Sequence, residues 1–355
     1  MNTRLNVLIA GLLSAFLVGC APAANAARTA VVSPLPTPSS DIQIESTTDI
    51  ALTAAKGTQL PSGLFFRVAQ SGLKLYGAGA VNPNGVALYQ VDLKTGSARQ
   101  IGTWRKGIGS IHASERYVVW EQTSDSQEYT EIHVYDLQQD REMVLAIHTA
   151  WVDISGDTVV WGDVQAYNLA LGKPIEVKNL HGRPSYPTIS DQWVIYLDPV
   201  TSYVADIYAH NLSTSEDFKI GTMPMLGDRI GTVDWYPVIS GKNIVWVSED
   251  NQLHQYDLNS RTDRVLPVSV SLEDSLNTPR FLALDGDTLV YEQGTWVGYD
   301  LARNVAFPIS RTSSQDNRGK RTMSTPVLIS NGRLVWQTQI DETVNLYMAD
   351  LIKNP

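Results

Sequence analysis

The stretch YPVISGKNIVWVSEDNQLHQYDL, residues 236–258, contains a pattern that recurs along the whole chain. Aliphatic residues lead to an aromatic residue, here Val245 and Trp246, and after a short hairpin an Asp-Leu pair follows, here Asp257 and Leu258. The aromatic residue occurs seven times, at Tyr76, Trp120, Trp161, Tyr196, Trp246, Tyr291 and Trp336. An Asp or Asn before Leu follows each of them, at Asp92, Asp136, Asn168, Asn211, Asp257, Asp300 and Asp350.

The spacing of these aromatic residues predicts the fold. Successive ones are 35 to 50 residues apart, a period typical of four-stranded propeller blades rather than helical solenoids. In the fifth repeat the pattern predicts strands over 236–240, 243–248, 253–258 and 263–268, separated by turn residues. The second of them is apolar on both faces, which suits a sheet packed between two others. We therefore predict an all-β chain that forms a seven-bladed β-propeller of four-stranded antiparallel blades over residues 49–355.

The last repeat has sequence for only three strands, the third over 344–351. A stretch near residues 50–60 has a suitable length to supply the fourth strand. We therefore expect an N-terminal strand to pair with the seventh blade and close the ring, an arrangement that leaves only short, protected sheet edges.

Residues 1–19 have the pattern of a targeting segment. Arg4 is followed by an apolar run over 7–18, which is too short to span a bilayer as a helix. The run ends in Leu-Val-Gly-Cys, which resembles the lipobox of bacterial lipoproteins. That resemblance implies cleavage before Cys20 and attachment of a diacylglycerol to its sulfur. Cys20 is the only cysteine and so has no disulfide partner; the alternative is an ordinary secretory signal.

Residues 20–48 are rich in Ala, Pro, Ser and Thr without an apolar period, which predicts a flexible tether. We expect the lipid on Cys20 to anchor the protein to the bacterial cell membrane or outer membrane, facing the periplasm or the exterior.

The charge balance argues against a nucleic-acid partner. The chain has 27 basic and 37 acidic residues, a net charge of −10, whereas nucleic-acid binding requires a basic surface. Residues 311–322 are a local exception, with four basic residues and one acid. We interpret this segment as a solvated loop between blades, with an anionic partner as the alternative.

The repeat explains most of the polar and aromatic residues. The recurring aromatic residues fit a core between blades, and the recurring Asp and Asn fit tight turns. His133, His210 and His254 also occupy recurring positions. We therefore expect functional residues in the longer connections between strands. Their aromatic and basic residues suit a face that binds a partner, and the candidates are Trp104, Arg105, Trp151, His181, Arg183, Tyr186, Arg229, Trp235 and Tyr236.

One group of residues could hold a metal ion. His112 and Asp153 occupy matching positions in the expected first strands of the second and third blades, and Asp234 opens that of the fifth. All three could face a central channel and bind a divalent cation, although polar contacts within the fold also explain them. The sequence has none of the common motifs for nucleophilic, zinc or nucleotide chemistry. We therefore assign no catalytic residue and no cofactor.

The repeat, with Val-Ile-Ser at the end of the first strand and Tyr-Asp-Leu at the end of the third, resembles the β-propeller repeats of bacterial cell-surface proteins. It resembles TolB-like propellers more loosely, and the likeness covers about residues 58–354. Propellers of this kind include both binding proteins and enzymes. We predict a monomeric, non-catalytic module that binds a protein or glycan partner with the face formed by the connections between second and third strands and between blades. The alternative is a metal-assisted hydrolase or lyase acting on sugars, lactones or cell-wall fragments.

Overall fold

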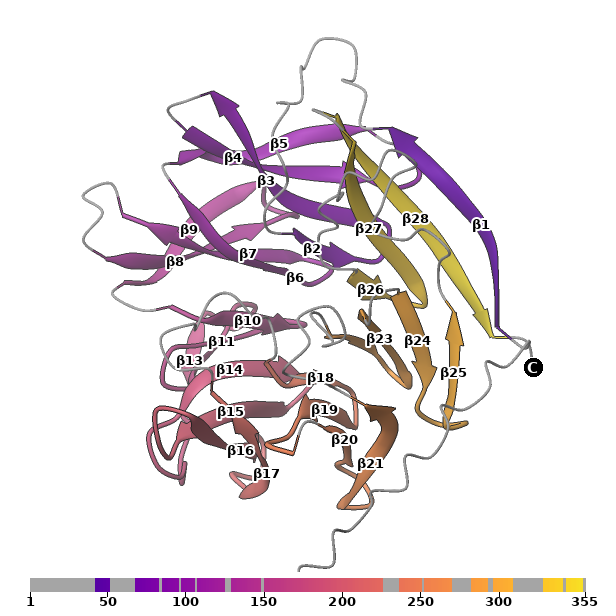
Figure 1. The fold of residues 1–355 in the computed structure, drawn as a ribbon. Coiled ribbons are helices and arrows are strands. Elements are labelled where there is room, and N and C mark those ends of the chain that lie inside the picture. The colour runs from indigo at the N-terminus through magenta and orange to yellow at the C-terminus, as the bar shows by residue number, and fades with distance from the viewer. Residues whose placement is uncertain are drawn as a thin grey trace, which may run out of the picture. The chain divides into compact units, whose positions relative to one another are not determined.

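A computed structural model of the chain describes residues 42–51, 68–82, 85–95, 97–105, 107–124, 129–147, 150–225, 236–250, 252–269, 282–292, 296–308, 328–340 and 343–353. Every helix or strand among them is a β-strand (Figure 1). A membrane-crossing helix is therefore absent from this described part. Cys20, the leader and most of the expected tether lie outside it.

The described strands form seven four-stranded antiparallel sheets, each built from strands in sequence order apart from the last. The first two sheets consist of β2 (Val68–Ser71), β3 (Lys74–Asn82), β4 (Gly85–Asp92), β5 (Ala98–Arg105), and β6 (Ile108–Ala113), β7 (Tyr117–Thr123), β8 (Thr130–Asp136), β9 (Arg141–Ile147). The third and fourth consist of β10 (Val152–Ser155), β11 (Thr158–Trp161), β12 (Gln165–Asn168), β13 (Lys173–Ile175), and β14 (Ser185–Ser190), β15 (Trp193–Pro199), β16 (Val204–Asn211), β17 (Asp217–Pro224).

The remaining sheets continue the same order. The fifth and sixth consist of β18 (Val238–Ser240), β19 (Asn243–Val247), β20 (Gln252–Asp257), β21 (Thr262–Ser269), and β22 (Leu282–Asp285), β23 (Thr288–Glu292), β24 (Trp296–Asp300), β25 (Val305–Pro308). The seventh consists of β26 (Leu328–Ser330), β27 (Arg333–Ile340), β28 (Thr343–Lys353) and β1 (Ile42–Ala51). The strands of the fifth sheet begin and end within about two residues of the predicted positions.

The first strands of the sheets contact one another in succession. β2 contacts β6, β6 contacts β10, and the series continues through β14, β18, β22 and β26. β26 in turn contacts β2. The first strands therefore form an unbroken cycle of contacts.

The seventh sheet takes its fourth strand from the N-terminal part of the chain. β1 pairs antiparallel with β28, with Ile50 opposite Leu346. We predicted this pairing, but we expected the strand at residues 50–60. It begins instead at Ile42, inside the stretch predicted as tether, because IQIESTTDIA is rich in β-branched residues that favour strands.

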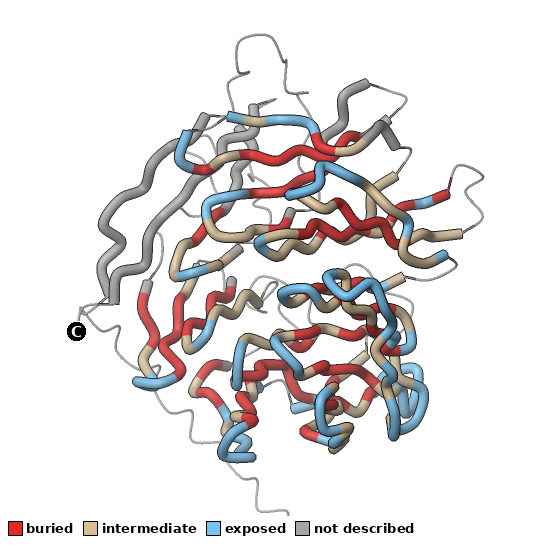
Figure 2. The backbone as a smooth tube through the Cα atoms, turned by 180° about the vertical axis from the view of Figure 1, so that it is seen from behind, coloured by how far each residue is buried: buried red, intermediate tan, exposed pale blue. Residues whose placement is uncertain are grey.

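The recurring aromatic residues form the core between sheets, as predicted. The six whose side chains are described are all buried, and they are Tyr76, Trp120, Trp161, Tyr196, Trp246 and Tyr291. Figure 2 shows the buried residues along the middle of the sheets and the exposed ones in the turns. Val245 of the fifth sheet packs in one cluster with Leu289 of the sixth, so the core is shared between neighbouring sheets.

The recurring Asp and Asn close the turn between third and fourth strands. Asp257 Oδ1 accepts hydrogen bonds from the backbone N–H groups of Asn259 and Ser260, both at 2.9 Å. The same side-chain oxygen makes equivalent bonds at Asp92, Asp136, Asn168, Asn211 and Asp300. This confirms the structural role that we predicted for these residues.

Among the described residues, a second polar position links five of the sheets to the next one. The serine that ends a first strand accepts a hydrogen bond from a backbone N–H in the first turn of the following sheet; Ser240 Oγ, for example, lies 2.8 Å from Gly286 N. Asp285 has this role in the sixth sheet. The other links are Ser155 to Asp191, Ser190 to Gly241 and Ser330 to Gly72, of which the last joins the seventh sheet to the first.

Trp246 packs against the backbone of Gly221 in β17, and a substitution at this glycine tests how tight the packing is. A Cβ atom at Gly221 would lie 2.5 Å from Cζ2 of the Trp246 ring, and the ring N–H donates to the Thr222 carbonyl at 3.2 Å. Gly221→Ala should overpack this site and destabilise the fold by about 1–3 kcal/mol, measured as a lower urea midpoint. Adding Trp246→Phe should recover part of that loss, and an unchanged midpoint for Gly221→Ala would show that the packing is loose.

Candidate functional site

Three of the predicted binding residues come together in one aromatic cluster. Trp151 precedes β10, Tyr186 lies in β14 and Tyr236 precedes β18, so each stands at the start of the first strand of a successive sheet. The ring centroids of Trp151 and Tyr186 are 4.3 Å apart, those of Trp151 and Tyr236 are 5.4 Å apart, and those of the two tyrosines are 5.2 Å apart. Residues far apart in sequence thus form one surface feature, which we call the aromatic cluster.

The three rings are not equally exposed. Tyr186 and Tyr236 pack against the apolar core shared by the fourth and fifth sheets. Trp151 is in none of the apolar clusters found among the described residues, and the residue is 37% exposed. The tyrosines therefore form the core side of the cluster, and Trp151 is its exposed member.

The backbone of the cluster is strained. Trp151 and Tyr186 have φ values of 60° and 54°, in the left-handed region that bulky residues rarely adopt. Such strain costs on the order of 1–3 kcal/mol and persists only where surrounding contacts enforce it. The Trp151 N–H donates to Glu121 Oε1 at 2.6 Å, and Gly162 N–H donates to the carbonyls of Ala150 and Trp151. These hydrogen bonds hold the backbone of Trp151 in its strained conformation.

Beneath the aromatic cluster, polar side chains connect three first strands. His112 of β6 lies with its Nδ1 2.9 Å from Asp153 Oδ1 of β10. The other carboxylate oxygen of Asp153 accepts hydrogen bonds from Thr188 Oγ1 at 2.6 Å and Ile189 N at 2.9 Å in β14. The structure therefore brings together two of the three residues predicted as metal ligands. The third, Asp234, lies outside the described residues.

The His112 and Asp153 pair shifts both pKa values toward the charged forms. Burial lowers the pKa of His112, but the charge and hydrogen bond of Asp153, with the charge of Glu121, raise it above its ordinary value. Burial raises the pKa of Asp153, but His112, Thr188 and the Ile189 N–H hold it below its ordinary value. The two side chains connect two sheets and form an ion pair when the imidazole is protonated. Within the described part of the chain, no three His, Cys, Asp or Glu side chains are arranged to hold a metal ion.

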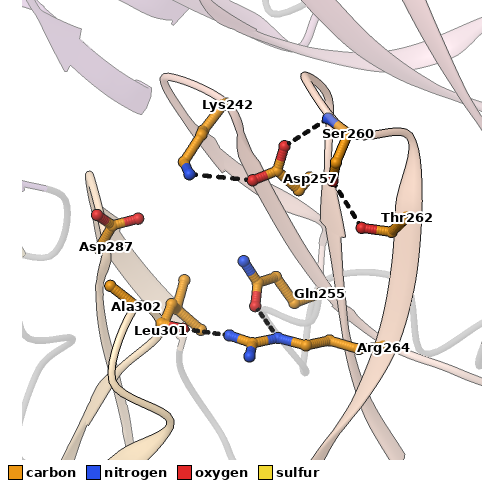
Figure 3. Close-up of a pocket in the computed structure, with 9 residues that line it drawn as sticks. All are labelled: Lys242, Gln255, Asp257, Ser260, Thr262, Arg264, Asp287, Leu301 and Ala302. Atoms are coloured by element: carbon orange, nitrogen blue, oxygen red, sulfur yellow. Dashed lines mark hydrogen bonds and ion pairs between the residues drawn. The ribbon is translucent and has the colours of Figure 1, made fainter.

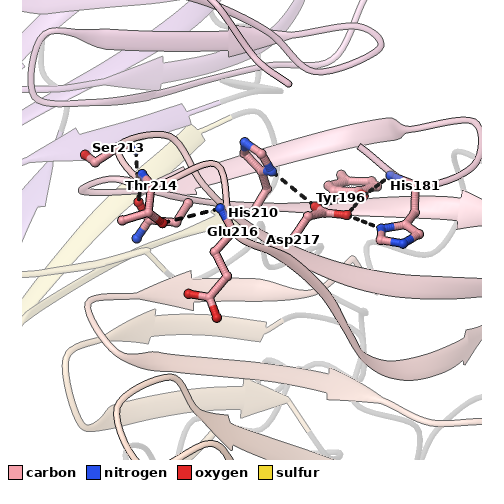
Figure 4. Close-up of polar contacts among 8 residues, drawn as sticks. His181, Tyr196, His210, Ser213, Thr214, Glu216 and Asp217 are labelled. Atoms are coloured by element: carbon pink, nitrogen blue, oxygen red, sulfur yellow. Dashed lines mark hydrogen bonds and ion pairs between the residues drawn. The ribbon is translucent and has the colours of Figure 1, made fainter. Parts of the chain in front are cut away.

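His181 is held in a second polar cluster, which Figure 4 shows. Its Nδ1 hydrogen-bonds the carboxylate of Asp217, which is only 2% exposed. The Tyr196 hydroxyl donates to the same carboxylate at 2.8 Å, and His210 Nδ1 lies 3.2 Å from it. Burial raises the pKa of Asp217, but these three partners hold it below its ordinary value. His181 also stacks on Tyr208, with ring centroids 5.0 Å apart.

The contacts of His181 fix the connection that precedes the fourth sheet. The backbone N–H of His181 donates to the Tyr196 hydroxyl at 2.9 Å, and that of Arg183 donates to Asp198 Oδ1 at 2.8 Å. Gly182 has a φ of 59°, and a Cβ atom there would collide with the Asp198 carboxylate. The imidazole thus anchors a loop, and the exposed Arg183 side chain belongs to the same loop.

Four further predicted residues have side chains outside the described part of the chain. We expected Trp104 and Arg105 in a connection, but their backbone lies in β5, where Arg105 pairs with Val86; the longer strand extends the ladder into that stretch. Arg229 and Trp235 lie outside the described residues, as does the basic segment 311–322.

A polar pocket that we did not predict lies between the fifth and sixth sheets (Figure 3). Its residues are Lys242, Gln255, Asp257, Ser260, Thr262, Arg264, Asp287, Leu301 and Ala302. Lys242 Nζ lies 3.1 Å from Asp257, and Arg264 donates to the Gln255 side chain and the Leu301 carbonyl. The first sheet repeats one of these contacts, from Arg99 to Gln90. The recurring Gln two residues before the Asp was the sequence signal for this arrangement, and we interpret the pocket as part of the repeat.

Comparisons with known proteins agree with this architecture. No known protein-family model and no curated protein matches the chain. The β-propeller domain of the Trilobed protease from Pyrococcus furiosus is similar in structure, with a TM-score of 0.56 and 13% identity over 80% of this chain and 94% of that one. The chain has a β-propeller fold.

Two further similar structures come from bacterial proteins. PorZ, a surface component of the type-IX secretion system of Porphyromonas gingivalis, aligns with a TM-score of 0.52 and 13% identity over 83% of this chain and 39% of that one. TolB from Acinetobacter baumannii aligns with a TM-score of 0.40 and 17% identity over 56% of this chain and 52% of that one. At these identities the likeness is one of fold alone.

The ion pair between blades two and three should be visible in the titration of His112. Its raised pKa means that the stabilisation is complete below the unfolded-state pKa of about 6.5 and is lost as the pH rises through the folded-state pKa. Asp153, whose pKa is lowered, contributes above an unfolded-state pKa of about 3.9 and loses its contribution as the pH falls through the folded-state pKa.

We therefore expect the NMR midpoint of the His112 imidazole to lie above about 6.5 and to fall in Asp153→Asn. Equal His112 midpoints in both proteins would contradict the pairing.

Proposed function

We propose that this chain is a non-catalytic binding protein that meets its partner at the aromatic cluster. The observation that carries this proposal is the exposed Trp151 ring, presented by a strained backbone and supported by two tyrosines from other blades. Exposed aromatic residues on a rigid base are typical of sites that dominate binding energy. Non-glycine residues that the surrounding structure holds in the left-handed region also tend to lie at functional positions.

The polar groups near the cluster favour binding over catalysis. Asp153 uses one carboxylate oxygen to contact His112 of the second blade and the other to contact Thr188 of the fourth, and Glu121 holds the backbone of Trp151. His181 and Asp217 likewise fix a loop. These side chains have roles in building the face, and the aromatic rings are left to contact a partner.

We further propose that the sheets form a closed, monomeric propeller of seven blades. The cycle of contacts among first strands, the pairing of β1 with β28 and the bond from Gly72 N–H to Ser330 support closure. The Pyrococcus furiosus propeller is described as having an open velcro topology. A strand from the opposite end of the chain that completes the last blade is a different arrangement.

The binding role can be tested with the full chain immobilised on beads and exposed to solubilised bacterial envelope. Trp151→Ala/Tyr236→Ala should lose most of the protein or glycan that the wild type retains, because two of the three rings are removed. Tyr203→Ala is the matched control, since Tyr203 is 69% exposed and outside the cluster. The urea midpoint of each variant shows that it is folded. Retention by the double variant equal to that of the wild type would place the binding face elsewhere.

We also propose that a lipid on Cys20 anchors the protein to a bacterial membrane, on the basis of the Leu-Val-Gly-Cys sequence and the absence of any other cysteine. Stable anchoring requires more than one acyl chain, and a diacylglycerol supplies two. Mass spectrometry of the purified protein should show a diacylglyceryl group on an N-terminal Cys20. Cys20→Ser should move the protein from the membrane pellet to the soluble fraction, and a variant that stays fully in the pellet would refute lipid anchoring at this residue.

A further inference from the structure

We propose that the partner bound at the aromatic cluster is a neutral carbohydrate, with one sugar ring stacked on Trp151. This inference rests on the binding role proposed above and names the chemistry of the ligand. It follows from three features of the face: the shape of the aromatic support, the mixture of polar groups beside it, and the charge.

The aromatic cluster is a packed platform rather than an open cage. The two tyrosine rings stack with an angle of 24° between their planes, and Trp151 meets them at 62° and 55°. Rings in mutual contact leave no space between them for a small cation, which is held by surrounding aromatic faces. A flat exposed ring instead suits a flat ligand with an apolar face, and a pyranose presents one through its C–H groups.

The polar groups around Trp151 include both hydrogen-bond donors and acceptors. The carboxylate of Glu121 accepts from Ser110 Oγ at 2.8 Å as well as from Trp151 N–H. His112, two residues after Ser110 along β6, has a side chain that is 38% exposed. A hydroxyl group both donates and accepts, so a polyhydroxyl ligand can use imidazole, hydroxyl and carboxylate partners together. Ligand sites commonly combine apolar and aromatic walls with a few such groups.

The carboxylates beside Trp151 disfavour acidic sugars. Glu121 contacts the Trp151 N–H, and Asp153 pairs with the imidazole of His112. The whole chain carries a net charge of −10, so long-range electrostatics also repels anionic polymers. A neutral oligosaccharide avoids this repulsion and can still satisfy the polar groups.

Glu121 is a positioning residue for Trp151. Its carboxylate holds the strained Trp151 backbone, and Gly109 leaves room for it, because a Cβ atom there would lie 2.6 Å from Glu121 Cβ. Removing the carboxylate releases the Trp151 backbone without removing the ring. Glu121→Gln keeps an acceptor oxygen, so it should retain more affinity than Glu121→Ala, a difference that a purely electrostatic role for Glu121 would not produce.

The test uses the purified full chain in a polyoxyethylene detergent, because glycoside detergents would compete for the site. Calorimetric titration with chitotetraose, cellotetraose and maltotetraose covers neutral chains, and tetragalacturonate and chitosan tetramer cover anionic and cationic ones. We expect at least one neutral tetramer to bind, and Trp151→Ala to weaken that binding by about tenfold or more. Tyr203→Ala should bind like the wild type.

Each other outcome overturns the inference. These outcomes are no binding of a neutral tetramer at millimolar concentration, binding that Trp151→Ala leaves unchanged, and preference for the anionic or cationic tetramer. If the carbohydrates fail while envelope protein is still retained in a manner that depends on Trp151 and Tyr236, the partner is a protein and the binding role stands. If retention is also independent of both rings, the proposed function fails as well.

Discussion

The fold depends on sheets that are apolar on both faces. All five residues of β19 are buried, and its Val245 and Trp246 point to opposite sides of the blade, into two different apolar clusters. A sheet of this kind is not stable with one face in water, so each blade requires a neighbour on both sides. Apolar packing stabilises the contact between blades but does little to fix how they align. In four blades the serine that ends the first strand fixes how neighbouring blades align, because its hydroxyl accepts a hydrogen bond from one particular N–H in the next blade.

The first strand of the third blade combines three roles within a few residues. In the third blade, Ser155 joins the next blade at one end, Asp153 joins two blades in the middle, and Trp151 stands exposed at the other end. Alternate residues of a strand point to the same side, so Asp153 and Ser155 share a side of β10. The polar contacts therefore form a rigid base beneath the aromatic residues. The order of the residues over five positions, 151–155, sets the order of these contacts along the strand.

Much of this architecture could be predicted because the repeat constrains it. The aromatic residues and the Asp-Leu pairs fixed the strands of the fifth blade to within about two residues, and the side-chain caps of the turns followed from Asp257 and its equivalents. β1 was placed too late in the chain because its sequence follows a Pro-rich stretch and belongs to no repeat. Spacing alone also gave no reason to place Arg105 in a strand.

The candidate site was predictable only in part. Assigning residues to recurring positions left Trp151, Tyr186 and Tyr236 without a structural role, and the matching positions of His112 and Asp153 predicted their proximity. The left-handed backbone of Trp151 and its bond to Glu121 could not be foreseen, because they depend on a contact between residues 30 positions apart in different blades. The Asp217 cluster was missed for the same reason, since His181 and Asp217 are 36 residues apart.

The pairing of β1 with β28 also has a mechanical consequence. The segment that precedes Ile42 leads toward the N-terminus, so any pull on that end of the chain reaches the propeller first at Ile42, which is paired with Lys353. The ladder between these two strands is antiparallel, and it would open one pair at a time from this end if the pull is across the strands, or resist as a whole if the pull is along them. The direction of the force on the N-terminal end thus decides whether the hydrogen bonds between β1 and β28 break one after another or bear the load together.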